Sequence, residues 1–167
     1  MKLLQHFGLF AFLLLAGMSS LWAQERLPSL ELANTKGEKI NVESYGKKEQ
    51  VVVLSFWATW CVPCRKELDN IAALYDEWKE KYNMQLVAVS VDDQRTSSRV
   101  PSYVNGKGWE YDVLLDTKEE LKRALNGLEV PYTVVLNKKG EIVYKHAGYT
   151  EGDELELEKK IAELSAE

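Results

Sequence analysis

The two cysteines of the chain, Cys61 and Cys64, are its residues best suited to chemistry, because only Val62 and Pro63 separate them. Two thiols at this spacing can close into a disulfide and open again, exchanging two electrons with other thiols. A structural zinc site needs four ligands, and the sequence has no second cysteine pair and no histidine cluster. A disulfide that closes so short a loop removes little chain entropy, so a purely structural bridge is a weak alternative. The pattern therefore predicts a redox-active pair.

The elements on either side of this pair determine its reactivity. Residues 51–60 begin with β-branched and aromatic residues typical of a buried central strand. Apolar residues between 68 and 82 recur at three- and four-residue steps and predict a helix that starts at the cysteines, with Pro63 in its first turn. Unpaired N–H groups and the helix dipole stabilise a thiolate at a helix start. We therefore expect Cys61 to be the attacking sulfur and Cys64, one turn deeper, to resolve the intermediate.

The rest of the chain predicts strands and helices that complete one sheet. Besides the strand before the cysteines, the predicted strands are residues 30–33, 39–42, 85–91, 111–115, 131–136 and 141–146. The predicted helices are a short one within 95–108 that Pro101 interrupts, one from an N-cap at Thr117 to Asn126, and one over 151–167. The strand at 85–91 forms a right-handed parallel βαβ unit with the strand before the cysteines. The first and last strand pairs are antiparallel hairpins.

Residues 56–64 resemble the active-site segment of the thioredoxin superfamily, and they read Phe-Trp-Ala-Thr-Trp-Cys-Val-Pro-Cys. They resemble in particular the exported thiol-disulfide oxidoreductases of the TlpA/ResA group. The order of the other predicted elements is similar too, so the resemblance covers nearly all of residues 24–167. It implies an α/β, thioredoxin-like fold, in which a central mixed sheet is flanked by helices, with an N-terminal β-hairpin and a βα insertion.

The resemblance also implies where a substrate binds. In the superfamily the peptide bond at the position of Val130–Pro131 is cis and faces the cysteines, which leaves a backbone edge that can pair with an extended segment. An ordinary trans proline that opens a strand is the alternative. We expect further substrate contacts at Trp60, Val62 and Pro63, beside the cysteines.

Four other residues bear on the chemistry. Tyr132 stands where the group usually has threonine, which leaves substrate selectivity open. Ser55 stands where plain thioredoxin carries a buried aspartate, so the proton of Cys64 needs another acceptor. The resemblance points to Asp93, at the end of the next strand, as a catalytic acid, with a solvated strand end as the alternative. His146 is expected to be a hairpin surface residue rather than a catalyst.

The first 23 residues have the pattern of a secretory signal peptide, with Lys2 before an apolar run and the small residue Ala23 before the predicted cut. The apolar run is short for a membrane span, and an uncleaved anchor is the alternative. Residues 24–167 are expected to form one thioredoxin-like domain. The formal charge of −5 becomes −6 once the single charge of Lys2 is removed, which argues against nucleic acid and anionic membrane surfaces as partners.

The residues and the resemblance together predict a thiol-disulfide oxidoreductase. We expect it to reduce disulfides of exported proteins in the periplasm, as in cytochrome c maturation, and to be recharged by a membrane electron donor. The chemistry needs no cofactor, and the sequence contains no haem or flavin motif. A disulfide oxidase or isomerase and a binding module without turnover are the alternatives. A peroxidase fits less well, because such sites usually start with a lone Thr-x-x-Cys.

Overall fold

The strand that leads into the cysteines, β3 (Val51–Trp57), lies inside the sheet, and all seven of its residues are buried. Its β-branched and aromatic side chains suit a strand that is covered on both faces. β3 pairs in parallel with β4 (Met84–Ser90) and antiparallel with β6 (Tyr132–Leu136). The protein is described by a computed structural model of residues 24–167, in which the strand order is β2-β1-β5-β4-β3-β6-β7. The predicted leader, residues 1–23, lies outside the described residues.

The remaining strands extend this sheet on both sides. β5 (Asp112–Leu115) pairs in parallel with β4, and β7 (Ile142–Ala147) pairs antiparallel with β6. β1 (Glu31–Asn34) and β2 (Lys39–Asn41) form the predicted N-terminal hairpin, and β1 also pairs antiparallel with β5. The prediction of a mixed sheet with a parallel βαβ unit and two hairpins is confirmed.

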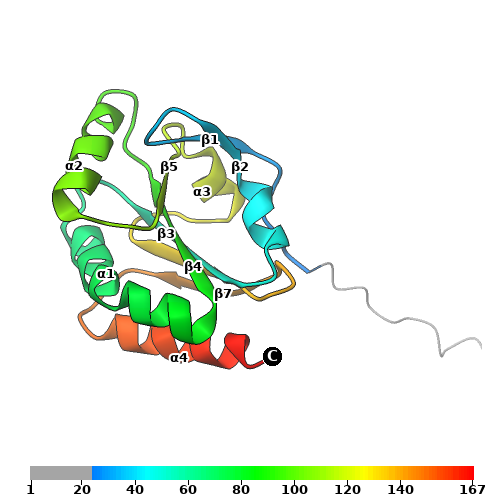
Figure 1. The fold of residues 1–167 in the computed structure, drawn as a ribbon. Helices are drawn as coiled ribbons and strands as arrows, with labels where there is room; N and C mark the ends of the chain where they lie inside the picture. Colours follow the sequence, from blue (N-terminus) through cyan, green and yellow to red (C-terminus); the bar gives the residue numbers. More distant parts are fainter. Residues whose placement is uncertain (1–23) are drawn as a thin grey trace, which may run out of the picture.

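The long helix α1 (Val62–Tyr82) and the C-terminal helix α4 (Asp153–Ser165) lie side by side against one face of the sheet (Figure 1). α1 turns one face inward, and the buried side chains of that face are Cys64, Glu67, Leu68, Ile71, Tyr75 and Trp78. α4 buries Leu157, Ile161 and Leu164, as the apolar spacing predicts. Within residues 24–167, no helix combines the length and the hydropathy needed to cross a membrane.

Two local predictions about the connecting helices are wrong. Pro101 does not interrupt a helix, because it lies in the first turn of α2 (Val100–Lys107), where its missing N–H costs no hydrogen bond. A short 3-10 helix, η2 (Ser97–Arg99), leads into α2, and another, η1 (Val42–Lys47), follows β2.

Thr117 is not the N-cap of the next helix, α3 (Glu120–Ala124). The carboxylate of Asp116 accepts hydrogen bonds from the backbone N–H groups of Glu120 and Lys122, at 2.8 and 2.9 Å. Asp116 is almost completely buried, so this carboxylate serves the helix start from inside the domain.

Candidate active site

Cys61 and Cys64 are joined by a disulfide at the start of α1, with their Cα atoms 5.4 Å apart. Cys61 is the N-cap residue of α1, and the backbone N–H of Cys64 points at its sulfur at 3.3 Å. An N–H directed at sulfur from the positive end of a helix stabilises a thiolate once the disulfide is reduced. Cys61 is 6% exposed and Cys64 is fully buried, so only the sulfur of Cys61 can meet a partner.

The turn before the cysteines is held by Asp92, which is fully buried. One of its carboxylate oxygens accepts hydrogen bonds from the backbone N–H of Thr59 at 2.8 Å and from the hydroxyl of Ser90 at 2.9 Å. The other accepts from the hydroxyl of Thr59 at 2.5 Å. Asp92 therefore ties the end of β4 to the segment that presents Cys61.

Asp93, the predicted acid, does not lie in the site. Its side chain is exposed and accepts hydrogen bonds within its own turn, from the N–H of Arg95 and from the N–H and hydroxyl of Thr96. These hydrogen bonds, led by the one from the Thr96 hydroxyl, lower the pKa of Asp93 below its ordinary value. A carboxylate that is easily ionised at the surface cannot hold a proton for a buried thiol, so the prediction of a buried Asp93 near Cys64 is wrong.

The buried carboxyl group of the site is Glu67, one helical turn after Cys64 on the same face of α1. Residues three apart on a helix are neighbours, with about 5–6 Å between their Cβ atoms. Ser55 donates to one Glu67 oxygen at 3.2 Å and Thr133 donates to the other at 2.9 Å. Burial raises the pKa of Glu67 to about 7, although these two hydroxyl donors lower it. Glu67 can therefore take and release a proton near neutral pH beside Cys64.

Sequence reasoning missed Glu67, although a signal was present. The residue falls among the apolar positions of the predicted helix, three residues after Cys64 and directly before Leu68. A carboxylate on such a face is buried and needs hydrogen-bond donors. Ser55 and Thr133 face each other as a cross-strand pair between β3 and β6 and supply those donors.

The predicted substrate contacts gather around the disulfide, and we call Trp60, Val62, Pro63, Val130 and Pro131 the docking surface. Trp60 and Val62 are 61% and 64% exposed, which is unusual for large apolar side chains. The Val130–Pro131 peptide bond is cis, as predicted, and the carbonyl oxygen of Val130 lies 3.9 Å from the sulfur of Cys61. The described part of the chain has no cluster of three or more histidine, cysteine, aspartate or glutamate residues placed to hold a metal ion.

Tyr132 anchors the segment that precedes the cis proline. Its hydroxyl donates to the carbonyl oxygen of Leu125 at 2.8 Å, and its ring packs against that of Phe56 with centroids 5.8 Å apart. A side chain at Gly127 would collide with the Tyr132 ring, so the loop passes directly over it. The tyrosine that replaces the usual threonine thus shapes the loop beside the docking surface.

A thioredoxin-like sheet with a two-cysteine disulfide at a helix start, facing a cis proline, defines the class of thioredoxin-fold redox proteins. The chain belongs to the AhpC/TSA family, whose model matches residues 23–145.

Comparison with curated proteins agrees with this class. The chain is 31% identical over 121 residues to sporulation thiol-disulfide oxidoreductase A of Bacillus subtilis, a match that covers 71% of each protein. It is 30% identical over 128 residues to the thiol-disulfide oxidoreductase ResA of the same organism, covering 77% of this chain and 69% of that protein. The predicted activity, thiol-disulfide oxidoreduction, is confirmed at this level.

Comparison with solved structures confirms the fold. A thioredoxin-like protein from Porphyromonas gingivalis superposes with a TM-score of 0.75 at 38% identity, covering 84% of this chain and 92% of that one. The crystal structure of StoA from Bacillus subtilis gives a TM-score of 0.61 at 26% identity, covering 79% and 99% of the two chains.

Proposed function

We propose that the protein is a reductase that transfers two electrons from Cys61 and Cys64 to disulfides of exported proteins. The observation that carries this proposal is the contrast between the two sulfurs. Cys61 keeps a small exposed fraction beside Val130, whereas Cys64 is fully buried one turn from Glu67. One sulfur is placed for attack, and the other is placed for resolution with a proton acceptor at hand.

The first step is attack on the substrate. An extended substrate segment pairs with the backbone at Val130, which brings its disulfide to the sulfur of Cys61. The Cys61 thiolate forms a bond to one substrate sulfur while the substrate disulfide breaks, and the departing thiolate takes a proton from water.

The second step releases the substrate. The Cys64 thiol gives its proton to the Glu67 carboxylate and attacks the sulfur of Cys61. The bond between Cys61 and the substrate breaks, the second substrate sulfur leaves as a thiolate, and the disulfide of the structure is formed. Two electrons have then moved to the substrate, and an electron donor must restore the dithiol.

The resemblance to the TlpA/ResA group supports a place in the periplasm, for example in cytochrome c maturation, with a membrane protein as the electron donor. Residues 1–23 are then the signal peptide, and Gln24 begins the mature protein. The sheet retains what it needs after such a cut, because the carbonyl oxygen of Glu25 accepts a hydrogen bond from the N–H of Ile142 at 2.8 Å. Mass spectrometry of the exported protein tests this, and a mass that includes residues 1–23 would make it a tethered enzyme.

Covalent trapping tests the order of attack. Cys64→Ala should accumulate substrate proteins as mixed disulfides on non-reducing gels of the exported fraction, because nothing can resolve them. Cys61→Ala should trap none, and a variant with both changes serves as the background. Equal trapping by the two single variants, or trapping by Cys61→Ala alone, would contradict the assigned roles.

Two alternatives are tested by other measurements. A disulfide oxidase or isomerase would use the same residues at a more oxidising potential, so the reduction potential of the Cys61–Cys64 couple separates it from a reductase. A binding module without turnover would leave insulin disulfides intact. The complete cysteine pair and the buried Glu67 argue against that reading.

A further inference from the structure

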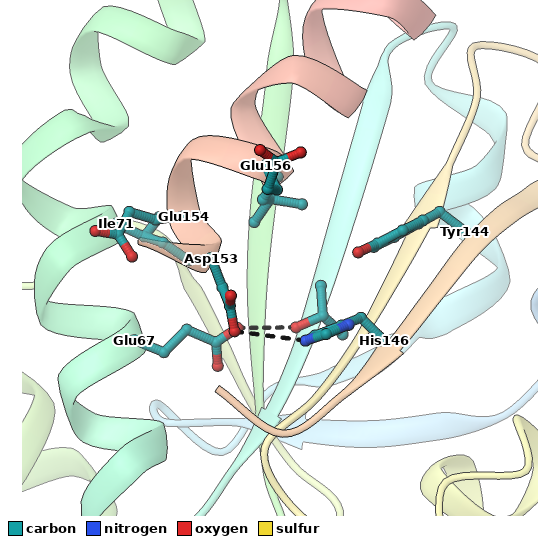
Figure 2. A pocket seen from close by; sticks show the side chains of 9 residues that line it. Glu67, Ile71, Tyr144, His146, Asp153, Glu154 and Glu156 are labelled. Carbon is teal, nitrogen blue, oxygen red and sulfur yellow. Dashed lines mark hydrogen bonds and ion pairs between the residues drawn. The ribbon is translucent and has the colours of Figure 1, made fainter. Parts of the chain in front are cut away.

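A cavity of about 230 Å³ lies between α1, the β6–β7 hairpin and the start of α4. Glu67 and Thr133 form its floor, and Ile71 and Leu157 belong to its walls. Figure 2 shows that side chains from α1, β7 and α4 point into this space. Its volume exceeds the roughly 30 Å³ that one molecule occupies in liquid water, so several waters fit.

The cavity runs from solvent to the carboxyl group of Glu67. At its mouth, Nε2 of His146 lies 3.6 Å from Oδ2 of Asp153, and the two side chains are 41% and 38% exposed. At its floor, Glu67 is only 5% exposed. None of the residues that line the cavity belongs to the docking surface.

The site needs a second opening to solvent because a protein substrate covers the opening at Cys61. Once a folded or extended segment covers Cys61, water is excluded from the front of the site. The buried Glu67 must still discharge the proton that it receives from Cys64. Proton transfer through water needs a chain of waters between polar groups, and the cavity has room for several waters between Glu67 and the polar side chains at its mouth.

We propose that this cavity is the route by which Glu67 exchanges protons with solvent while substrate covers the cysteines, and that His146 and Asp153 relay protons at its mouth. This inference rests on the proposed role of Glu67 in the resolving step. In the direction of substrate reduction, the proton passes from Cys64 to Glu67, then through cavity water to His146, and from there to solvent.

The charged groups around the cavity are compatible with this route. Besides Glu67, the titratable side chains that line it are Tyr144, His146, Asp153, Glu154 and Glu156. On its other sides Glu67 faces Cys64 and Tyr111. The negative charges of Asp153 and Glu154 add to burial in raising the pKa of Glu67, so α4 favours the protonated acid. The imidazole ring of His146 stacks on Tyr144 with centroids 6.3 Å apart, and an imidazole has two ring nitrogens, one of which can accept a proton while the other donates one.

The test compares a large and a small disulfide in multiple-turnover reactions with saturating disulfide and excess dithiothreitol, because Glu67 must discharge its proton before it can accept the next one. Insulin covers the docking surface, whereas oxidised glutathione leaves it open to water. His146→Gln should lower the rate with insulin about a hundredfold, the lower end of the range for a lost acid–base group, and leave the rate with glutathione unchanged. Free imidazole in the buffer should restore the insulin rate of this variant.

Two further variants sharpen the comparison. Leu157→Phe narrows the cavity and should also slow insulin reduction, but imidazole should not restore it. Val143→Gln is the matched control, because Val143 is exposed on the other face of β7, and both rates should stay at the wild-type value.

The outcomes separate this proposal from the proposed function. Unchanged insulin reduction by His146→Gln would overturn the route, and so would an equal loss with both disulfides that imidazole does not restore. Glu67→Gln should slow the reaction with both disulfides. If it slows neither, the proposed role of Glu67 fails; if it slows both while His146→Gln slows neither, only the cavity route fails.

Discussion

At the scale of single residues, Glu67 links the stability of the disulfide form to pH. Burial raises its pKa from an ordinary value of 4.5 to about 7, so between these values the folded chain holds a proton that the unfolded chain has lost. The contribution of Glu67 to the free energy of unfolding is therefore largest below pH 4.5, and it is lost as the pH rises to about 7. The loss should amount to about 3 kcal/mol.

Glu67→Gln should remove this pH dependence and make the disulfide form more stable than the wild type at pH 8. Urea unfolding at pH 5 and pH 8 measures the pH dependence of the unfolding free energy in the wild type and in Glu67→Gln. Subtracting one from the other cancels the contribution of the other titrating groups. Glu31→Gln, at an exposed position of β1, is the control. Parallel pH profiles for wild type and Glu67→Gln would show that Glu67 titrates normally.

Asp92 and Asp93 are adjacent carboxylates, and we expect replacement of the first to be costly and replacement of the second to have little effect. Asp92→Asn should cost about 2–3 kcal/mol of unfolding free energy, because one amide cannot accept all the hydrogen bonds from Thr59 and Ser90. It should also slow thiol exchange by loosening the turn before Cys61. Asp93→Asn should leave both properties nearly unchanged, since its carboxylate serves only an exposed turn. Urea unfolding midpoints and rates of insulin reduction compare the two variants. Equal effects of Asp92→Asn and Asp93→Asn would contradict the structural role given to Asp92.

At the scale of elements, local sequence patterns predicted the strands and helices around the cysteines, because an apolar run and an apolar stripe are local properties. The inward carboxylate at the end of β4 was not predictable in this way. The pattern extended that strand to residue 91, whereas β4 ends at Ser90 and the chain then turns Asp92 back toward Thr59. The helical pattern places Glu67 on the inward face of α1, but one of its hydrogen-bond donors, Thr133, lies 66 residues away in the sequence.

The β6–β7 turn depends on a glycine for two independent reasons. Gly140 has a φ of +73°, and a Cβ atom there would overlap the carbonyl oxygen of Gly46 in η1. Gly37, in the β1–β2 turn, has a φ of +82° but open space around it. Gly37→Ala should therefore cost about 1–2 kcal/mol of unfolding free energy through backbone strain alone.

Gly140→Ala should cost clearly more, about 3 kcal/mol or above, because the two turns must also move apart. Chemical denaturation of both variants in the disulfide form measures the difference. Equal losses would show that the η1 turn yields easily and that only the left-handed backbone matters.

At the scale of the whole molecule, the routes proposed for the substrate and for protons use different elements of the fold. The docking surface lies at the start of α1, and the cavity reaches Glu67 from between β7 and α4. Both the attacking thiolate and the Glu67 carboxylate carry negative charge when ionised, and they share the low-dielectric interior around the first turns of α1. Closing the disulfide removes one of these charges, so the repulsion between them favours the disulfide, whereas the N–H of Cys64 and the helix start favour the Cys61 thiolate. If the repulsion is the larger effect, the fold prefers the disulfide.

This preference predicts which form of the protein is more stable. The disulfide and dithiol forms differ in unfolding free energy. This difference is set by the difference between the reduction potentials of the folded and unfolded cysteine pairs, and 30 mV of potential corresponds to about 1.4 kcal/mol. A disulfide form that is the more stable of the two lowers the potential of the folded couple below that of the unfolded couple, which is the direction that favours a reductase. The gap should widen between pH 6 and pH 8 as Glu67 ionises, and it should narrow in Glu67→Gln.

Urea unfolding of the protein with and without a reductant measures this gap, and a variant with serine at both cysteine positions shows whether the reductant itself affects stability. A dithiol form that is more stable than the disulfide form would contradict the reductase and favour the oxidase or isomerase, because the fold would then drive electrons into the cysteine pair. A gap that is the same in wild type and Glu67→Gln would mean that some other feature of the α1 start sets the preference for the disulfide.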